Sequence, residues 1–352
     1  MAQEIELKLS LPPSAQQQLL QHPLLQQLSI AKCEQRQLFN LYFDTPDQAL
    51  NQHRVALRIR SQGERYIQTL KTKGNSGGGL HQRQEWEWDL PEPVLDLSLL
   101  PANSLPEAID IGAIQPAFNT DFMRTAWQLQ LRQDNRQAHI ELVLDDGFAA
   151  TGKTSHTGND KNKMPTDPIS EIELELISGD PQLIFFLAIE LTKTIPLRIS
   201  RISKAERGFR LQNSAAGQGP AVKTFASSAA DPASELLAHL LEYCQSLIES
   251  FEFEDKPQYL IQLMQRLQEL QALLSSSAIK VSSITTQQLS ENYQQLQELL
   301  APWILEQQYP CNFSDDNDRQ RRLRQCRELL QGVPLAQCLL QLSYRVFLDT
   351  RQ

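Results

Sequence analysis

The feature that most constrains the fold of this chain is the alternation of charged and aliphatic residues through its first 211 residues. The opening stretch EIELKL places Glu4, Glu6 and Lys8 on one face of a strand and aliphatic residues on the other, because successive side chains of a β-strand point to opposite faces. The two carboxylates then lie about 6.6 Å apart, which is two rises of roughly 3.3 Å. Their repulsion is about 2.5 kcal/mol at an effective dielectric constant near 20. The strand therefore either faces water or uses its carboxylates to hold a counter-charge.

Several later segments repeat this alternation, and many carry mainly one sign of charge on the polar face. A polar face that is exposed to solvent accounts for the charges of any one of these strands. It accounts less well for all the strands together, because like charges on neighbouring strands destabilise a sheet. Strands are predicted near 3–9, 37–44, 54–61, 64–72, 82–90, 123–133, 137–146 and 169–177, and helices near 13–28 and 180–194. The charged faces carry Arg58, Arg60, Lys71, Arg83, Glu85, Glu87, Arg124, Asp145, Glu171, Glu173 and Glu175.

A closed barrel of about eight antiparallel strands accounts for this pattern, because closure removes the exposed edges of a sheet. With the charged faces inward, acids and bases meet in one lumen, and the aliphatic faces point outward under the two predicted helices. Carboxylates beside bases favour a polyphosphate with divalent cations, since Mg²⁺ prefers oxygen ligands and Arg presents a planar fork to phosphate. The sequence predicts an α+β fold, an eight-stranded antiparallel β-barrel with flanking helices that is followed by an all-α bundle.

The residues after 211 follow a different pattern. Residues 212–232 are small, polar and interrupted by Pro and Gly, which is typical of a linker. Apolar residues then recur at helical spacing, which predicts a helical bundle. We therefore expect a β-rich domain at 1–211, a linker at 212–232 and a helical domain at 233–352, and a chain ending near residue 212 is expected to fold alone. The predicted helices lie near 236–248, 257–275, 285–308, 318–331 and 334–349.

Charge and cysteine content narrow the classes of function. A net charge of −9 repels nucleic acid and acidic membranes, so any polyanion site must be a local pocket of bases. No apolar run approaches the ~18 residues of a membrane span, and the start MAQEIEL is unlike a signal peptide. The five cysteines are scattered without a CxxC pair, which favours a reducing compartment. We expect a cytoplasmic protein that binds a small molecule and neither nucleic acid nor membrane; the sequence does not specify its oligomeric state.

These motifs together resemble the CYTH superfamily, the triphosphate tunnel metalloenzymes. The stretch EIELK matches the family signature E-x-E-x-K. Eight further stretches that resemble the family follow it in order: LYFDTPDQAL, LRIR, QTLKTKG, GGLHQRQEWEW, TDFMRTAWQL, VLDDG, EIELELISGD and SRISKAERGF. The resemblance covers about 1–211 and is closest to bacterial inorganic triphosphatases, which carry a helical CHAD-type domain after the tunnel. Residues 221–352 hold 11 Lys and Arg against 16 Asp and Glu, so this half resembles a short or divergent CHAD domain.

The resemblance implies a closed eight-stranded tunnel that uses Mg²⁺ or Mn²⁺, with two ions bound beside the substrate. It also implies roles for single residues, with Glu4, Glu6 and Lys8 at the catalytic centre. The further lumen candidates are Glu85, Glu87, Glu171 and Arg207. The implied metal ligands are Glu4, Glu6, Asp145, Glu173 and Glu175, and the implied phosphate-binding bases are Lys8, Arg58, Arg60, Lys71, Arg83, Arg124 and Lys204.

Two classes of function remain open at this point. The leading hypothesis is a metal-dependent inorganic triphosphatase that hydrolyses tripolyphosphate to pyrophosphate and phosphate. An adenylate cyclase or a thiamine or nucleoside triphosphatase shares the tunnel chemistry but needs an apolar or stacking pocket beside the phosphates. A non-catalytic polyphosphate-binding module needs only the bases, so the presence of every acid favours the enzyme.

Overall fold

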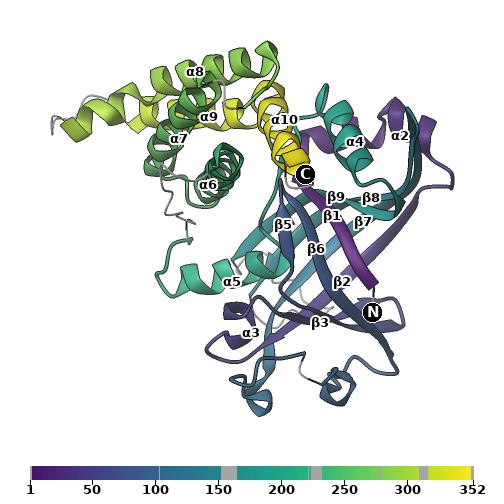
Figure 1. Ribbon diagram of the computed structural model, residues 1–352. Helices are drawn as coiled ribbons and strands as arrows, with labels where there is room; N and C mark the ends of the chain where they lie inside the picture. The colour runs from purple at the N-terminus through teal and green to yellow at the C-terminus, as the bar shows by residue number, and fades with distance from the viewer. Residues whose placement is uncertain are drawn as a thin grey trace.

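The first half of the chain forms a closed β-barrel. The computed structural model describes residues 2–102, 104–151, 165–220, 222, 232–276, 279–308 and 316–349. Within these residues, ten strands form one sheet in the order β10-β1-β9-β8-β7-β2-β3-β4-β6-β5, and β1 also pairs with β6. This extra pairing closes a ring of eight antiparallel strands (Figure 1). The strands are β1 (Ala2–Ser10), β2 (Glu34–Asp44), β3 (Ala56–Gln62), β4 (Arg65–Lys71), β5 (Asn75–Gly77), β6 (Leu80–Leu90), β7 (Gln115–Gln133), β8 (Arg136–Ala150), β9 (Thr166–Gly179) and β10 (Arg198–Ile199).

The predicted eight-stranded barrel is confirmed as the closed ring, but the whole sheet has two further strands in the described residues. β5 and β10 contain only three and two residues, too few to show a period of two in the sequence. β7 begins at Gln115 rather than near residue 123. In the β1–β9 pairing, Lys8 lies opposite Glu173, so the charged faces of the first and last long strands share one side of the sheet.

The aliphatic faces of the strands point outward and are covered by helices, as the barrel hypothesis requires. Leu7 and Leu9 of β1 are fully buried in a core that includes Phe185 of α4. On the other side of the barrel, Trp86 and Trp88 pack with the segment 91–114. The covering helices are α1 (Gln16–Leu20), α2 (Pro23–Leu28), α3 (Ala49–Gln52) and α4 (Gln182–Thr192), with short 3₁₀ helices at Pro13–Ala15, Leu97–Leu99 and Ile111–Ala113.

Helix α5 (Lys204–Ala215) lies against the barrel and includes residues 212–215, which the sequence placed in a linker. The linker prediction thus began inside a helix, and residues 221 and 223–231 of it lie outside the described residues. α5 approaches β7 closely at Gly208, where a Cβ atom would come 2.0 Å from the Phe118 ring. Gly208 therefore sets how near α5 can lie to the barrel.

The second half of the described chain is helical, and its last helix packs back onto the barrel. Figure 1 shows α10 between the other helices of the bundle and the barrel. Phe347 of α10 lies 4.8 Å from Phe185 of α4, measured between ring centroids. A Cβ atom at Gly78, in the β5–β6 turn, would come 2.5 Å from the Ser343 carbonyl oxygen. The helices are α6 (Ala233–Glu254), α7 (Pro257–Ser275), α8 (Ser283–Gln308), α9 (Asp316–Leu330) and α10 (Val333–Asp349).

The barrel and the bundle therefore share part of one apolar core, because Leu340 and Phe347 of α10 belong to the cluster that surrounds Leu7. The bundle has a second core of its own, centred on α6, α7 and α10. The division into domains at 211 and 233 remains a proposal. Across the described residues, no helix has the length and apolar character needed to cross a bilayer.

Candidate active site

The charged faces of the strands line a cavity of about 670 Å³ inside the barrel. Its walls come from all eight strands of the ring and from the start of α5. This arrangement follows from the period of two, because an outward aliphatic face places the alternate charged residues in the lumen. The charged and polar residues that line the cavity are Glu4, Lys8, Tyr42, Arg58, Arg60, Lys71, Glu85, Glu87, Arg124, Glu141, Glu173, Glu175, Ser203 and Lys204.

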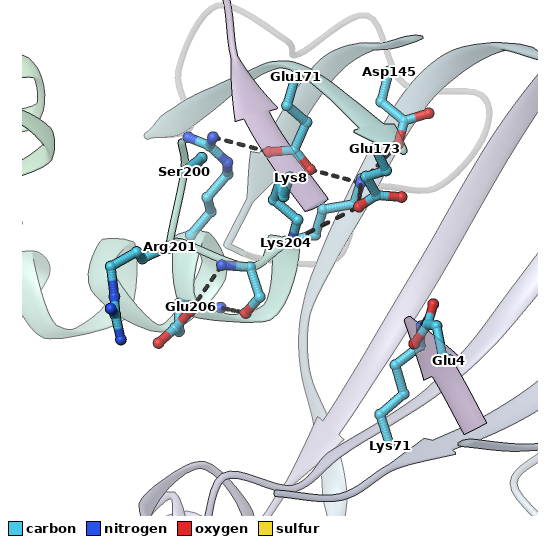
Figure 2. A network of polar contacts seen from close by, with 12 residues as sticks. Glu4, Lys8, Lys71, Asp145, Glu171, Glu173, Ser200, Arg201, Lys204 and Glu206 are labelled. Atoms are coloured by element: carbon cyan, nitrogen blue, oxygen red, sulfur yellow. Dashed lines mark hydrogen bonds and ion pairs between the residues drawn. The ribbon is translucent and has the colours of Figure 1, made fainter. Parts of the chain in front are cut away.

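One group of lumen residues, the Lys204 cluster, consists of Lys204 and the acids Asp145, Glu171 and Glu173 (Figure 2). The Lys204 Nζ atom lies 2.6 Å from Asp145 Oδ2, 2.7 Å from Glu171 Oε1 and 2.9 Å from Glu173 Oε1. The ammonium group donates hydrogen bonds to Glu171 and Glu173 and forms an ion pair with Asp145. One oxygen atom from each acid lies within 4.8 Å of the others, and Lys204 occupies the position where they converge.

Two guanidinium groups complete the neutralisation of the Lys204 cluster. Arg124 donates to both oxygens of Asp145 at 2.7 and 2.6 Å, and to Glu173 at 2.9 Å. Arg207 donates to Glu171 at 3.0 Å. Burial alone raises the pKa of Glu171, but Lys204, then Lys8 and Arg207, outweigh it and lower the pKa to about 2. Glu171 is therefore ionised, and cations of the chain already compensate its charge.

A second group, the Glu175 cluster, consists of Glu4, Glu6, Glu141 and Glu175. Burial, followed by the charges of Glu4 and Glu141, raises the pKa of Glu175 to about 7, and Lys71 opposes this. The Lys71 Nζ atom lies 3.1 Å from Glu4 and 2.9 Å from Glu85. Burial and the neighbouring carboxylates thus both disfavour the charged form of Glu175. This cluster therefore has the charge and the oxygen donors that suit a divalent cation.

Arg58 and Arg60 lie on β3, where burial opposes the charged form of both side chains, although Tyr42 and Glu85 outweigh it and raise the pKa of Arg58. In the described part of the chain neither guanidinium forms an ion pair with a carboxylate; Arg58 donates to the Tyr42 hydroxyl at 3.3 Å, and Arg60 to Asn40 Oδ1 at 3.1 Å. The Nε atom of Arg58 is buried with no hydrogen-bond partner among the described residues. Burial, then the positive charges of Arg58 and Arg124, lowers the pKa of Arg60 to about 9. An anion at this position would relieve both effects.

The other predicted site residues include Lys8, Glu6 and Arg83. Lys8 is buried, and its Nζ atom lies 3.7 Å from Glu173. Glu6 is buried as well and lines a smaller neighbouring cavity of about 190 Å³ together with Lys8 and Lys71. Arg83 lies opposite Glu4 in the backbone register, but its side chain lies outside the described residues. The cavity thus brings together most of the predicted acids and bases.

Two lining residues were missed as site candidates although the sequence carried a signal for them. Glu141 lies four residues before Asp145 on β8, and hence on the same face of that strand. Tyr42 alternates with the outward residues Leu41 and Phe43 of β2. Both positions follow from the same period of two that identified the charged faces.

The fold and the site together define a class of protein, a closed antiparallel barrel whose lumen is lined by acids and bases. Comparison with known families gives the same result. The model of the CYTH domain matches residues 2–209, and the chain belongs to this family.

The chain is similar to an inorganic triphosphatase of Haemophilus influenzae, with 35% identity over 216 residues. This match covers 60% of the chain and 55% of the relative, so the chain matches about half the length of that curated protein. A solved structure from Hippeastrum, named for adenylyl cyclase activity and described as having a dominant triphosphatase activity, is 21% identical. That match covers 61% of this chain and 96% of the other, with a TM-score of 0.40. A Bacillus halodurans structure named for adenylate cyclase activity is 20% identical, covers 55% of this chain and 91% of the other, and has a TM-score of 0.30.

Proposed function

We propose that the protein is a metal-dependent inorganic triphosphatase that hydrolyses tripolyphosphate to pyrophosphate and phosphate inside the barrel. The observation that carries the proposal is the separation of charge within one cavity. Arg58 and Arg60 offer guanidinium groups that form no ion pair with a carboxylate in the described chain, and burial together with neighbouring carboxylates raises the pKa of Glu175. An anionic substrate and a divalent cation suit these two groups together. The likeness to an inorganic triphosphatase of Haemophilus influenzae supports the same reaction.

The Glu175 cluster fits Mg²⁺ or Mn²⁺ best. Its carboxylates supply the oxygen ligands that these ions prefer. Asp145 and Glu173 are each held by both Lys204 and Arg124, so an ion there requires the Lys204 ammonium group to leave, whereas an ion at the Glu175 cluster requires Lys71 to leave Glu4. We therefore assign Glu4, Glu6 and Glu175 as the principal ligands. When bound, such an ion neutralises phosphate charge and lowers the pKa of a coordinated water.

The bases of the chain bind and orient the substrate in this proposal. Arg58 and Arg60 present planar forks that match phosphate oxygens and stabilise the charge on them during transfer of the terminal phosphoryl group. Lys8 lies beside Glu173, where its ammonium group holds the substrate or the attacking water in place. Lys204 forms ion pairs with three carboxylates, so we assign it the role of orienting the acids rather than binding phosphate.

The lining favours an inorganic rather than an organic triphosphate. An organic substrate needs an apolar or stacking surface beside the phosphates. The Tyr42 ring already stacks on Phe118 with centroids 4.8 Å apart. Trp86 and Trp88 also border the cavity, and both pack in the apolar cluster with Leu95 and Leu97. The aromatic rings near the cavity are thus engaged in packing.

A substrate panel tests the proposal. The purified protein is incubated with tripolyphosphate, ATP or thiamine triphosphate, each with Mg²⁺, with Mn²⁺ or with EDTA, and phosphate and cyclic AMP are measured. We expect phosphate release from tripolyphosphate that EDTA abolishes. Cyclic AMP from ATP, or preferred turnover of an organic triphosphate, would show another reaction of the same fold. Tight binding of tripolyphosphate without metal-dependent turnover would show a binding module instead.

One variant pair tests the role of the acids. Glu6→Gln keeps the shape of the side chain and removes its charge, and we expect turnover to fall at least about 100-fold, or about 2.7 kcal/mol of transition-state stabilisation. The control is Glu190→Gln, which changes a glutamate of α4 that pairs with Lys193 on the outer surface. Turnover of Glu6→Gln near the wild-type value at saturating Mg²⁺ would remove Glu6 from the metal site.

A further inference from the structure

Helix α6, the first of the bundle, contacts the segment of chain that joins the barrel to α5. This segment, Arg198–Ser203, begins with β10 and ends at the N-cap of α5. Arg198 Nη2 lies 2.5 Å from Glu252 of α6, and Arg201 forms an ion pair with Glu242. The bases of the segment thus face the acids of α6.

Glu249 makes the central contact between α6 and this segment. Its Oε1 atom accepts hydrogen bonds from the Arg201 backbone N–H at 2.8 Å and from the Ser200 hydroxyl at 3.1 Å. Glu242 and Glu249 are seven residues apart, about two helical turns, and so lie on one face of α6. A carboxylate that accepts a backbone N–H fixes the main chain of the segment, and not only a side chain.

The same segment connects to two lysines of the lumen, because it is hydrogen-bonded to the backbone of Lys8 and is followed directly in the chain by Lys204. The Ser200 backbone N–H donates to the Lys8 carbonyl oxygen at 2.9 Å. Ser203 caps α5, with its hydroxyl accepting from the Glu206 N–H at 3.1 Å and its own N–H donating to Glu206 Oε2 at 2.7 Å. This capping box fixes where α5 begins, and Lys204 is the first residue of the helix. Figure 2 shows Ser200, Arg201 and Glu206 on one side of Lys8 and Lys204.

We propose that α6 is a positioning element of the active site: Glu249, with Glu242 and Glu252, holds the Arg198–Ser203 segment and thereby sets the positions of Lys8 and Lys204 in the lumen. The inference rests on the proposed triphosphatase function, and it assigns the helical bundle a role in that function. Glu249 is a positioning residue, since it acts through Ser200 and Arg201 and lines no part of the main cavity.

The test uses the full chain and compares Glu249→Ala with Glu249→Gln. Alanine removes the acceptor, whereas glutamine keeps an oxygen that accepts from the same two donors. We expect Glu249→Ala to lower kcat for tripolyphosphate at least tenfold with a smaller change in KM, and Glu249→Gln to recover most of it. The control is Glu235→Ala, which changes an exposed glutamate in the first turn of the same helix.

A second readout is independent of activity. Lys204 is 5% exposed and ion-paired, so an amine-acetylating reagent followed by mass spectrometry should leave it unmodified in the wild type. In Glu249→Ala we expect faster acetylation of Lys204 and faster amide exchange over residues 200–208. If the wild type lacks triphosphatase activity but these changes occur, the proposed function fails and the positioning role stands.

The inference would be overturned if kcat, the acetylation rate of Lys204 and the amide exchange of residues 200–208 in Glu249→Ala all equalled the wild-type values. Equal loss of kcat in Glu249→Ala and Glu249→Gln, with unchanged exchange, would also overturn it. If Glu249→Ala does not fold, Ser200→Ala serves instead, because it removes one of the two hydrogen bonds to Glu249. This variant is expected to show smaller effects in the same direction. Unchanged amide exchange at residues 200–208 in Ser200→Ala would count against the proposal.

Discussion

Replacement of Lys204 by Met tests the charge balance of the Lys204 cluster, because Met keeps a similar volume and removes the charge. The ammonium nitrogen lies within 2.9 Å of an oxygen of each of three carboxylates and the residue is 5% exposed. Removal of one partner from a buried ion pair costs about 3–5 kcal/mol. Because Arg124 and Arg207 still contact the acids, we expect the lower end of this range, about 3 kcal/mol.

Thermal unfolding followed by circular dichroism in EDTA measures this loss. A loss of about 3 kcal/mol lowers Tm by about 6–12 °C, since 1 kcal/mol shifts Tm by about 2–4 °C in a cooperative unit of 150–250 residues. Mg²⁺ or Mn²⁺ should restore part of the loss in Lys204→Met. Without the ammonium group, the three acids within 4.8 Å of one another can share a divalent ion, and an ion that binds only the folded state stabilises it.

The matched control is Lys193→Met, which changes a lysine whose side chain is 55% exposed and pairs with Glu190 one turn earlier. Exposed pairs of this kind contribute about 0–1 kcal/mol, so its Tm should change little. An unchanged Tm for Lys204→Met in EDTA would refute the reasoning. So would a fall in Tm that divalent ions reverse no better than they raise the Tm of the wild type.

Three further predictions follow from the same structure. The double change Arg58→Lys and Arg60→Lys keeps the charge but loses the planar forks, so kcat/KM for tripolyphosphate should fall at least about tenfold, or about 1.4 kcal/mol; unaltered kinetics would mean that these side chains do not contact phosphate. Gly208→Ala inserts a methyl group that would come 2.0 Å from the Phe118 ring, and a lowered urea midpoint equivalent to about 1–3 kcal/mol is expected; a wild-type midpoint contradicts the close packing of α5. Contrary to the expectation from the sequence that the first half folds alone, a chain that ends at residue 220 exposes Phe185, which α10 covers, and should aggregate in size-exclusion chromatography; a monodisperse, active fragment would show that the barrel folds without the bundle.

Much of the barrel and its lumen could be predicted from the sequence, because alternation is a local property. A β-strand must send successive side chains to opposite faces, so EIELKL alone determined that Glu4, Glu6 and Lys8 share one face and that Leu7 lies on the other. The outward aliphatic cover followed from the same pattern, since Leu7 had to be buried somewhere. The change to helical spacing after the linker likewise predicted the bundle.

Only the tertiary structure decided which charges meet. Sequence spacing says nothing about register between strands, so the pairing of Lys8 with Glu173 and the position of Lys204 among three acids depended on how distant segments fold together. For this reason the family resemblance grouped Asp145 and Glu173 with the metal ligands, and the sequence could not show that Lys204 and Arg124 already contact them.

The relation of the two halves was also decided by tertiary packing. The sequence pattern suggested separate domains because the linker lacks apolar periodicity. The contact of Phe347 with Phe185 joins residues 162 positions apart, and the bond from Arg201 to Glu249 joins residues 48 positions apart. Neither contact can be read from the local sequence. An apolar residue in a helix is compatible with any partner that buries it. An acid on a helix face is expected to be solvated unless the structure shows a donor beside it.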